Sequence, residues 1–258
     1  MAMAASTCSC NSTLRPCIFF HGLGNENDEP ELQDSSRHFG WDKIQGHAPC
    51  CTVIKYAALN TVDYAWTNSS LQEKVCTHTI SMSDTSDLSS RTIEDTIVVT
   101  HSMGGLMLAG ALCKLGKSST WVALSPPMTG SMSSDYLMDF CNGEVRNLMT
   151  DLLFNGRCPT SKATQSCVYK KEKYSYEKRD TAYDAAQEAY RKHVFAAMCS
   201  SSYVGNISKY QAKYIMGGRI IPTSRLRTTG SSSFTVARAD FRQISLDERT
   251  GINSTSAS

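Results

Sequence analysis

Short apolar runs divide the first half of the chain, and each is closed by small or polar residues. Four runs combine β-branched and aromatic residues over a few positions, a pattern typical of strands buried in a sheet. The sequence His-Gly-Leu-Gly follows the first run directly and indicates a tight turn. The predicted strands are 17–20, 52–56, 96–100 and 120–124.

Helical spacing of apolar residues separates these strands. We predict a loose helix over 61–78 and a clearer one over 103–115, which Gly116 would end. Strands that alternate with helices favour a parallel sheet, and near-continuous apolar strands favour one covered on both faces. The expected fold class is therefore α/β, with a mainly parallel sheet flanked by helices.

The pattern changes after Met128. A helical stretch is predicted over 135–153, a polar Lys/Tyr-rich stretch over 158–178, and an amphipathic helix over 181–199. Glycines at 217–218 predict a turn into a further strand. Because this region interrupts the alternation of strands and helices, we interpret 129–200 as a cap.

The domain limits follow from where the apolar pattern holds. We expect one domain over 14–222, which includes the cap. From 223 to 258 the chain is rich in Ser, Thr and Arg without a sustained apolar pattern, so a divergent, poorly ordered tail is expected there.

The composition argues against nucleic-acid binding, binding to anionic membranes and a transmembrane segment. The chain has 258 residues, of which 41% are hydrophobic and 19% charged, as in globular proteins. Its formal net charge is +2, which offers no electrostatic basis for binding nucleic acid or an anionic membrane. No apolar run approaches the ~20 residues that span a bilayer, so no transmembrane segment is expected.

Cysteine is the unusual component. Eleven cysteines and four Asn-x-Ser/Thr triplets, at Asn11, Asn68, Asn206 and Asn253, favour a secreted, disulfide-bonded glycoprotein. Residues 1–10 contain no charged leader or hydrophobic segment. Either a signal peptide is missing from this chain, or the protein is cytosolic with free thiols. The odd count leaves at least one thiol unpaired within the chain.

A zinc site is the alternative use of some cysteines. His38, His47, Cys50 and Cys51 could be drawn as ligands, but their spacing fits no standard zinc pattern. Disulfide use of these cysteines is the favoured interpretation, and neither a metal nor a cofactor is expected.

The strongest candidate for chemistry is Ser102. It follows the third predicted strand and precedes a helix, in the sequence Thr100-His-Ser-Met-Gly104-Gly. This resembles the G-x-S-x-G nucleophile elbow of α/β-hydrolases, where a sharp turn exposes the serine above the sheet. Thr100 departs from that pattern because it replaces the first glycine and crowds the turn.

The resemblance extends to His21-Gly22-Leu23-Gly24, which is similar to the H-G-x motif of lipases and esterases. In that family, the amide after H-G and the amide after the nucleophile form the oxyanion hole. By position these are the N–H groups of Leu23 and Met103. Residues 14–128 thus resemble the first half of an α/β-hydrolase of the lipase and acyl-thioesterase branch, which includes palmitoyl-protein thioesterase and glycosylphosphatidylinositol inositol-deacylase types.

The remaining catalytic groups are harder to find. The family places an acid and then a histidine after the nucleophile. His193 is the one histidine that follows Ser102, and it falls inside a predicted helix, where a packing role is favoured. Asp135 follows the fourth strand, where some lipases carry their acid. Asp180 and Asp184 fall at a predicted helix start, where capping explains them.

The tail offers an explanation for this gap. Back-translation from Pro222 in a frame shifted by one base permits a reading that contains N-D-G-L-V, similar to an acid-bearing loop of lipases. The shifted reading also supplies a twelfth cysteine. We therefore interpret the C-terminus as the product of a frameshift or an unspliced intron.

Two functional hypotheses follow. The first is a lipase- or esterase-like serine hydrolase that cleaves ester or thioester bonds of an acyl or lipid substrate and is inactive if no base replaces the missing histidine. The second is a secreted, non-catalytic hydrolase-fold protein that binds a lipid or a protein partner.

Overall fold

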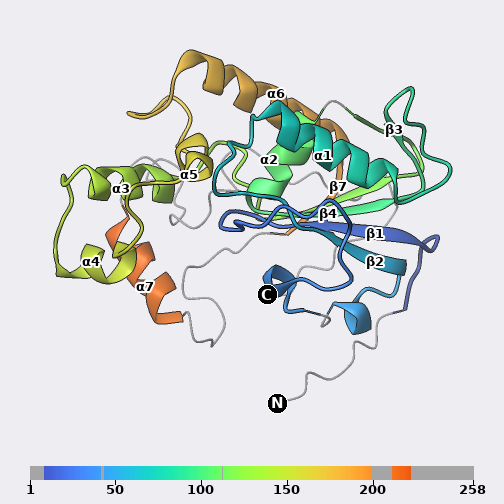
Figure 1. The fold of residues 1–258 in the computed structure, drawn as a ribbon, viewed down its shortest axis with the longest axis horizontal. Coiled ribbons are helices and arrows are strands. Elements are labelled where there is room, and N and C mark those ends of the chain that lie inside the picture. The colour runs from blue at the N-terminus through green and yellow to red at the C-terminus, as the bar shows by residue number, and fades with distance from the viewer. Residues whose placement is uncertain (1–8, 42–43, 112, 199–210, 222–258) are drawn as a thin grey trace, which may run out of the picture.

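The computed structural model describes residues 9–41, 44–111, 113–198 and 211–221. Its centre is a five-stranded sheet in the order β2-β1-β4-β6-β7, in which every neighbouring pair is parallel (Figure 1). The expected mainly parallel sheet is therefore confirmed. Its strands are β1 (Arg15–Phe20), β2 (Cys51–Ala57), β4 (Ile97–His101), β6 (Thr120–Leu124) and β7 (Val194–Met198).

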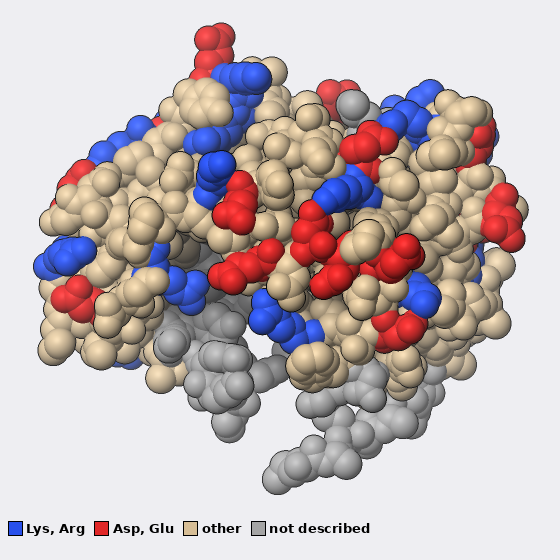
Figure 2. All heavy atoms as spheres, in the orientation of Figure 1, with Lys and Arg blue, Asp and Glu red and all other residues tan. Residues whose placement is uncertain are grey.

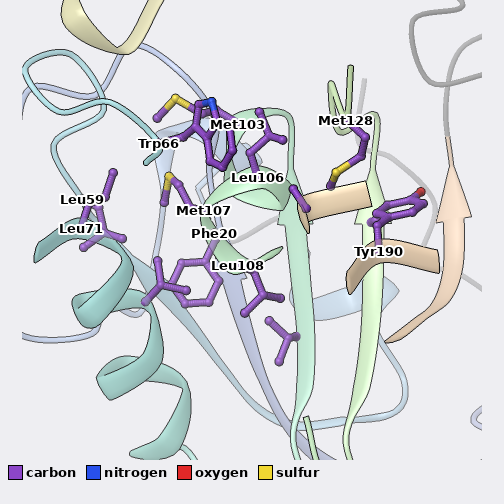
Figure 3. Close-up of a cluster of buried hydrophobic side chains, with 14 of the residues drawn as sticks. Phe20, Leu59, Trp66, Leu71, Met103, Leu106, Met107, Leu108, Met128 and Tyr190 are labelled. Atoms are coloured by element: carbon purple, nitrogen blue, oxygen red, sulfur yellow. The ribbon is translucent and has the colours of Figure 1, made fainter. Parts of the chain in front are cut away.

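Three helices cover one face of the sheet: α1 (Ser69–Ile80), α2 (Met103–Gly110) and α6 (Glu177–His193). In the structure they lie together on one side of the strands (Figure 1). Phe20 from β1, Leu106 from α2 and Trp66 from the loop before α1 are all buried in the cluster between the layers (Figure 3). Helix α2 has apolar residues on all sides because it is enclosed by α1, α6 and the sheet.

The opposite face is covered differently. Phe19, Tyr56 and Val99 form a second apolar cluster there, with Phe39 and Ile44 packed against it. These last two lie in the connection between β1 and β2, which holds the short 3-10 helices η1 (Arg37–Phe39) and η2 (Gln45–His47). In the described part of the chain the sheet therefore carries α-helices on one face and this connection on the other, because the segment has no helical spacing of apolar residues.

Disulfides hold this N-terminal region to the sheet. Cys10 is bonded to Cys50 and Cys17 to Cys51, while Cys141 and Cys158 form a third bond farther along the chain. Cys50 and Cys51 are each bonded to another cysteine, which confirms the disulfide interpretation of these two residues. Among the described residues, no cluster of His, Cys, Asp and Glu side chains could hold a metal ion.

The region expected as a cap contains two kinds of structure. The helices α3 (Met132–Cys141), α4 (Leu148–Phe154) and α5 (Lys162–Ser166) form a group to one side of the sheet, together with α7 (Gln211–Ile220) (Figure 1). By contrast, α6 packs on α2 and β7 pairs with β6. These two elements, although inside 129–200, thus belong to the sheet and its helical layer.

Several predicted boundaries were wrong. The helix of 181–199 ends at His193, because Val194 takes an extended conformation and pairs with β6. Helix α2 ends at Gly110 rather than near Gly116, and 114–115 instead forms β5, paired with β3 (Thr92–Ile93). The stretch 135–153 contains two helices, and 217–220 is helical rather than a turn into a strand.

The surface carries charges of both signs. On the face drawn in Figure 2, acidic and basic side chains are interspersed, in keeping with the small net charge. None of the helices in the described ranges is long and apolar enough to cross a bilayer. The tail expected over 223–258 lies outside the described residues.

Candidate active site

Ser102 occupies a strained turn between β4 and α2. Its backbone angles are φ 52° and ψ −127°, in a region that residues with a side chain rarely adopt. The Ser102 N–H donates to Leu124 O at 2.9 Å, and the Ser102 carbonyl accepts from Gly105 N–H at 3.0 Å. The turn is thus hydrogen-bonded to β6 on one side and to the first turn of α2 on the other.

The glycines after Ser102 are required by close packing. A Cβ added to Gly104 would lie 2.7 Å from the carbonyl oxygen of His21 and 2.8 Å from that of Phe20. A Cβ on Gly105 would lie 2.6 Å from the Cβ of Pro126. A side chain at either position would therefore push the start of α2 away from the end of β1 or from the loop after β6.

Thr100, the departure from the G-x-S-x-G pattern, is accommodated by a hydrogen bond. Its side chain is fully buried, and its Oγ1 accepts from the Trp121 indole N–H at 2.8 Å. Trp121 lies on β6 beside β4, so the hydroxyl satisfies a donor that would otherwise be buried without a partner.

The His21-Gly22-Leu23 segment lies against the nucleophile turn. A Cβ on Gly22 would fall 2.6 Å from Ser102 Cβ and 3.0 Å from Ser102 Oγ. Leu23 is the next residue, and Met103, with a fully buried side chain, begins α2. The structure therefore brings together the two segments that carry Ser102, Leu23 and Met103.

His21 has a structural role in this segment. It is buried, its Nε2 accepts from Leu59 N–H at 3.1 Å, and its Nδ1 lies 2.8 Å from Gly22 O. Nδ1 therefore carries the hydrogen. Burial lowers the pKa of His21 to about 4, so the ring is neutral at physiological pH.

Thr61 was missed by the sequence analysis. Its hydroxyl donates to Gly22 O at 2.8 Å and accepts from Asn25 N–H at 3.1 Å. It fixes the turn that holds Leu23, although nothing in the local sequence around Thr61 indicates this role.

Two further histidines lie at this end of the sheet. The His38 ring stacks on His21, with ring centroids 4.6 Å apart, and His101 is the last residue of β4. Phe39, the residue after His38, has its ring centroid 6.3 Å from that of His101. Burial, followed by the nearby Arg37 charge, lowers the pKa of His38.

His193 lies at the other end of the sheet. Val194, the next residue, pairs with Trp121, which in turn pairs with Val98. Val98 precedes Ser102 by four residues, or about 13 Å along a strand, and β7 lies two strands away from β4. His193 is therefore beyond direct or single-water reach of Ser102 Oγ.

The candidate acids make structural contacts. Asp135 is buried in α3, and its Oδ2 accepts from Tyr169 N–H at 2.6 Å. Asp180 accepts from Lys171 N–H and from the Ser175 hydroxyl, and Asp184 pairs with Lys170. Each therefore holds the segment between α5 and α6 rather than a histidine beside Ser102.

Comparisons with known proteins gave fold-level similarity. No family model and no curated protein matches the sequence. The lipase BlEst2 of Bacillus licheniformis in its propeptide form aligns with 77% of this chain at a TM-score of 0.42 and 14% identity. A lipase-esterase related protein from Clostridium acetobutylicum ATCC 824 aligns with 73% at a TM-score of 0.37 and 13% identity. The chain spans 39% of the first structure and 86% of the second. At these values the similarity says nothing about activity.

Proposed function

We propose that the protein is a lipase- or esterase-like serine hydrolase that cleaves ester or thioester bonds, with Ser102 as nucleophile. The observation that carries this proposal is the strained conformation of Ser102, held by neighbours that leave no room for a side chain at Gly22 or Gly104. Strain of this kind persists where the surrounding structure enforces it and is concentrated at functional sites.

In the proposed reaction, Ser102 Oγ attacks the acyl carbon. The N–H groups of Leu23 and Met103 stabilise the oxyanion that forms, and each such donor is worth roughly 3–4 kcal/mol of transition-state stabilisation. Helix α2 begins at Met103, so its positive N-terminal end faces the same charge.

The nucleophile also needs a base. All six histidines of the chain lie in the described part. Three of them are at the carboxyl end of the sheet: His21 directly follows β1, His101 ends β4, and His38 stacks on His21. Both ring nitrogens of His21 are engaged. The Nε2 of His38 accepts from Arg37 Nε–H at 3.4 Å, which engages one of its two ring nitrogens. We propose that the base is His101, which adjoins Ser102 in sequence, or His38.

We propose that α3, α4, α5 and α7 form a cap that binds an apolar acyl substrate, since these helices form a group beside the sheet. Helix α4 exposes Leu148, Met149 and Leu152, an apolar surface that would contact acyl chains.

We further propose that the protein is secreted. Three disulfides in the described residues are the supporting observation, because such bonds persist in oxidising compartments. The exposed Asn11 and the half-buried Asn68 would then be available as glycosylation acceptors.

A non-catalytic binding protein is the second candidate. The observation that favours it is that Asp135, Asp180 and Asp184 bind backbone N–H groups or a lysine, and that His193 lies at the far end of the sheet from Ser102.

Hydrolysis of p-nitrophenyl esters and acyl thioesters, measured for wild type and Ser102→Ala, distinguishes the hydrolase from the binding protein. Turnover abolished by Ser102→Ala supports the hydrolase, whereas equal rates for both, together with saturable binding of a fluorescent fatty acid, support the binder.

A further inference from the structure

Two cysteines outside the three disulfides lie against each other. Cys76 is on α1, and Cys113 follows the end of α2. The two thiols are close enough to act on each other's ionisation, and Cys113 packs against the cluster that contains Cys76. Cys76 is buried in a small apolar cluster with Ile80 and Ile93, against which Cys113 and Leu115 pack. This cluster is separate from the site around Ser102.

The surroundings of the pair favour thiolate chemistry. Arg91 is close enough for its charge to act on both sulfurs, and its guanidinium is held by two hydrogen bonds to Glu73, at 3.0 Å and 2.6 Å. Glu73 lies one helical turn before Cys76 on α1. The interaction with Cys113 has the largest effect and lowers the pKa of the Cys76 thiol, against the opposing effect of burial and with a smaller contribution from the Arg91 charge. The same interaction, together with burial, raises the pKa of Cys113, so the pair loses its first proton easily and its two sulfurs share the second.

We propose that Cys76 and Cys113 form a fourth disulfide by exchange with a small-molecule disulfide such as glutathione disulfide. One thiolate of the pair attacks a glutathione sulfur and releases one glutathione thiolate. The second cysteine, deprotonated, then attacks the protein sulfur of the mixed disulfide and releases the second glutathione. The two protein thiols lose two electrons and two protons, and the glutathione disulfide is reduced to two glutathione molecules.

Accessibility supports this exchange. Cys113 is half-buried, so a tripeptide disulfide can reach one sulfur of the pair, while Cys76 is buried beside it as the second partner. Cys167, the third free cysteine among the described residues, is fully buried in the main core cluster together with Tyr183, and it does not belong to the cluster of Cys76. It serves as the matched control.

The new bond would connect two helices that pack on each other. It would join α1 to the residues just after α2, whose first residue follows Ser102. The bond would thus fix the far end of the helix that begins at the nucleophile turn. The inference rests on the two thiols alone and does not depend on hydrolase activity.

Peptide mapping tests the proposal on the full chain. Purified wild-type protein is equilibrated with glutathione buffers from fully reduced to fully oxidised, free thiols are blocked with iodoacetamide, and the protein is digested with trypsin. Cleavage after Lys74, Arg91 and Lys114 places Cys76 in peptide 75–91 and Cys113 in peptide 92–114. Each of these peptides has one cysteine, so they can remain joined only through this disulfide.

The expected result is a joined 75–91/92–114 species, lighter than its two free peptides by two hydrogen atoms, that grows as the buffer becomes more oxidising. Cys167→Ser should form it equally, and Cys113→Ser should instead leave Cys76 alkylated. Alkylation of both cysteines at every ratio would overturn the proposal. So would joining of either peptide to the peptides that contain Cys8, Cys167 or Cys199.

Discussion

Gly22 lies against Ser102 so closely that a methyl group on Gly22 would be 2.6 Å from the Ser102 Cβ. The contact joins the end of β1 to the turn after β4 and sets the position of Leu23 relative to the Ser102 hydroxyl. The two motifs are about eighty residues apart in sequence, and the parallel pairing of β1 with β4 brings them together.

Gly22→Ala should therefore impair the site more than the fold. The added methyl must displace the Ser102 turn or the Leu23 segment, at a cost of about 1–3 kcal/mol in stability. Displacing one oxyanion donor should slow ester hydrolysis on the order of 10²-fold. The matched control is Gly46→Ala, since a Cβ at Gly46 would meet nothing within 4 Å. Equal hydrolysis rates for the two variants would contradict the proposed site.

Thr100→Val tests how this chain tolerates a residue larger than glycine before the nucleophile. The substitution keeps the shape but removes the oxygen that accepts from Trp121. The buried indole N–H would lose its partner, so the free energy of unfolding should fall by about 1–3 kcal/mol in urea denaturation. Thr100→Ser retains the hydroxyl and should lose less. A Val variant as stable as wild type would show that this hydrogen bond is unimportant.

Asp135 should make stability depend on pH. Burial raises the pKa of its carboxyl to about 6, and its Oδ1 has no hydrogen-bond partner. Because the folded pKa lies above the ordinary value of about 4, ionisation opposes folding, and stability is lost as pH rises between about 4 and 6. The size of the loss should be on the order of 1–3 kcal/mol.

Asp135→Asn isolates this effect because the amide cannot ionise. The unfolding free energy of the variant minus that of wild type should increase from pH 4 to pH 7, and all other titrating groups cancel in the difference. Urea denaturation at several pH values measures it. A difference that stays constant with pH would mean that Asp135 does not titrate in this interval.

The histidines at the carboxyl end of the sheet should matter for reactivity, and His193 should not. If His38 or His101 activates Ser102, replacement of that residue by Gln should slow ester hydrolysis on the order of 10²–10⁴-fold. His193→Gln should leave the rate unchanged, because Val194 is level with Val98 rather than with Ser102. Loss of activity in the His193 variant, with the fold intact, would contradict the strand register.

Much of the parallel sheet could be predicted from the sequence. The run Thr120–Leu124 coincides with β6, and β4 differs from its predicted limits by one residue. These strands are apolar runs bounded by polar or small residues, so local pattern and tertiary structure agree. The elbow motif likewise combines a strand, a turn and a helix within ten residues.

The errors arose where tertiary contacts outweigh local spacing. Val194–Met198 continues the helical spacing of α6, yet pairing with β6 makes it a strand. Ala111 adopts an extended conformation and ends α2 before Gly116 is reached. The backbone partner of Asp135 and the neighbour of Cys76 come from residues more than thirty positions away, so local pattern could not indicate them.

Covalent labelling of Ser102 tests the central proposal most directly. Native protein is treated with a fluorophosphonate, digested with trypsin and mapped by mass spectrometry; Ser102 is the only serine in peptide 92–114. The hydrolase proposal predicts an adduct on that peptide in the native protein and none after denaturation or in Ser102→Ala. An unlabelled peptide 92–114, under conditions where a known lipase is labelled, would contradict it.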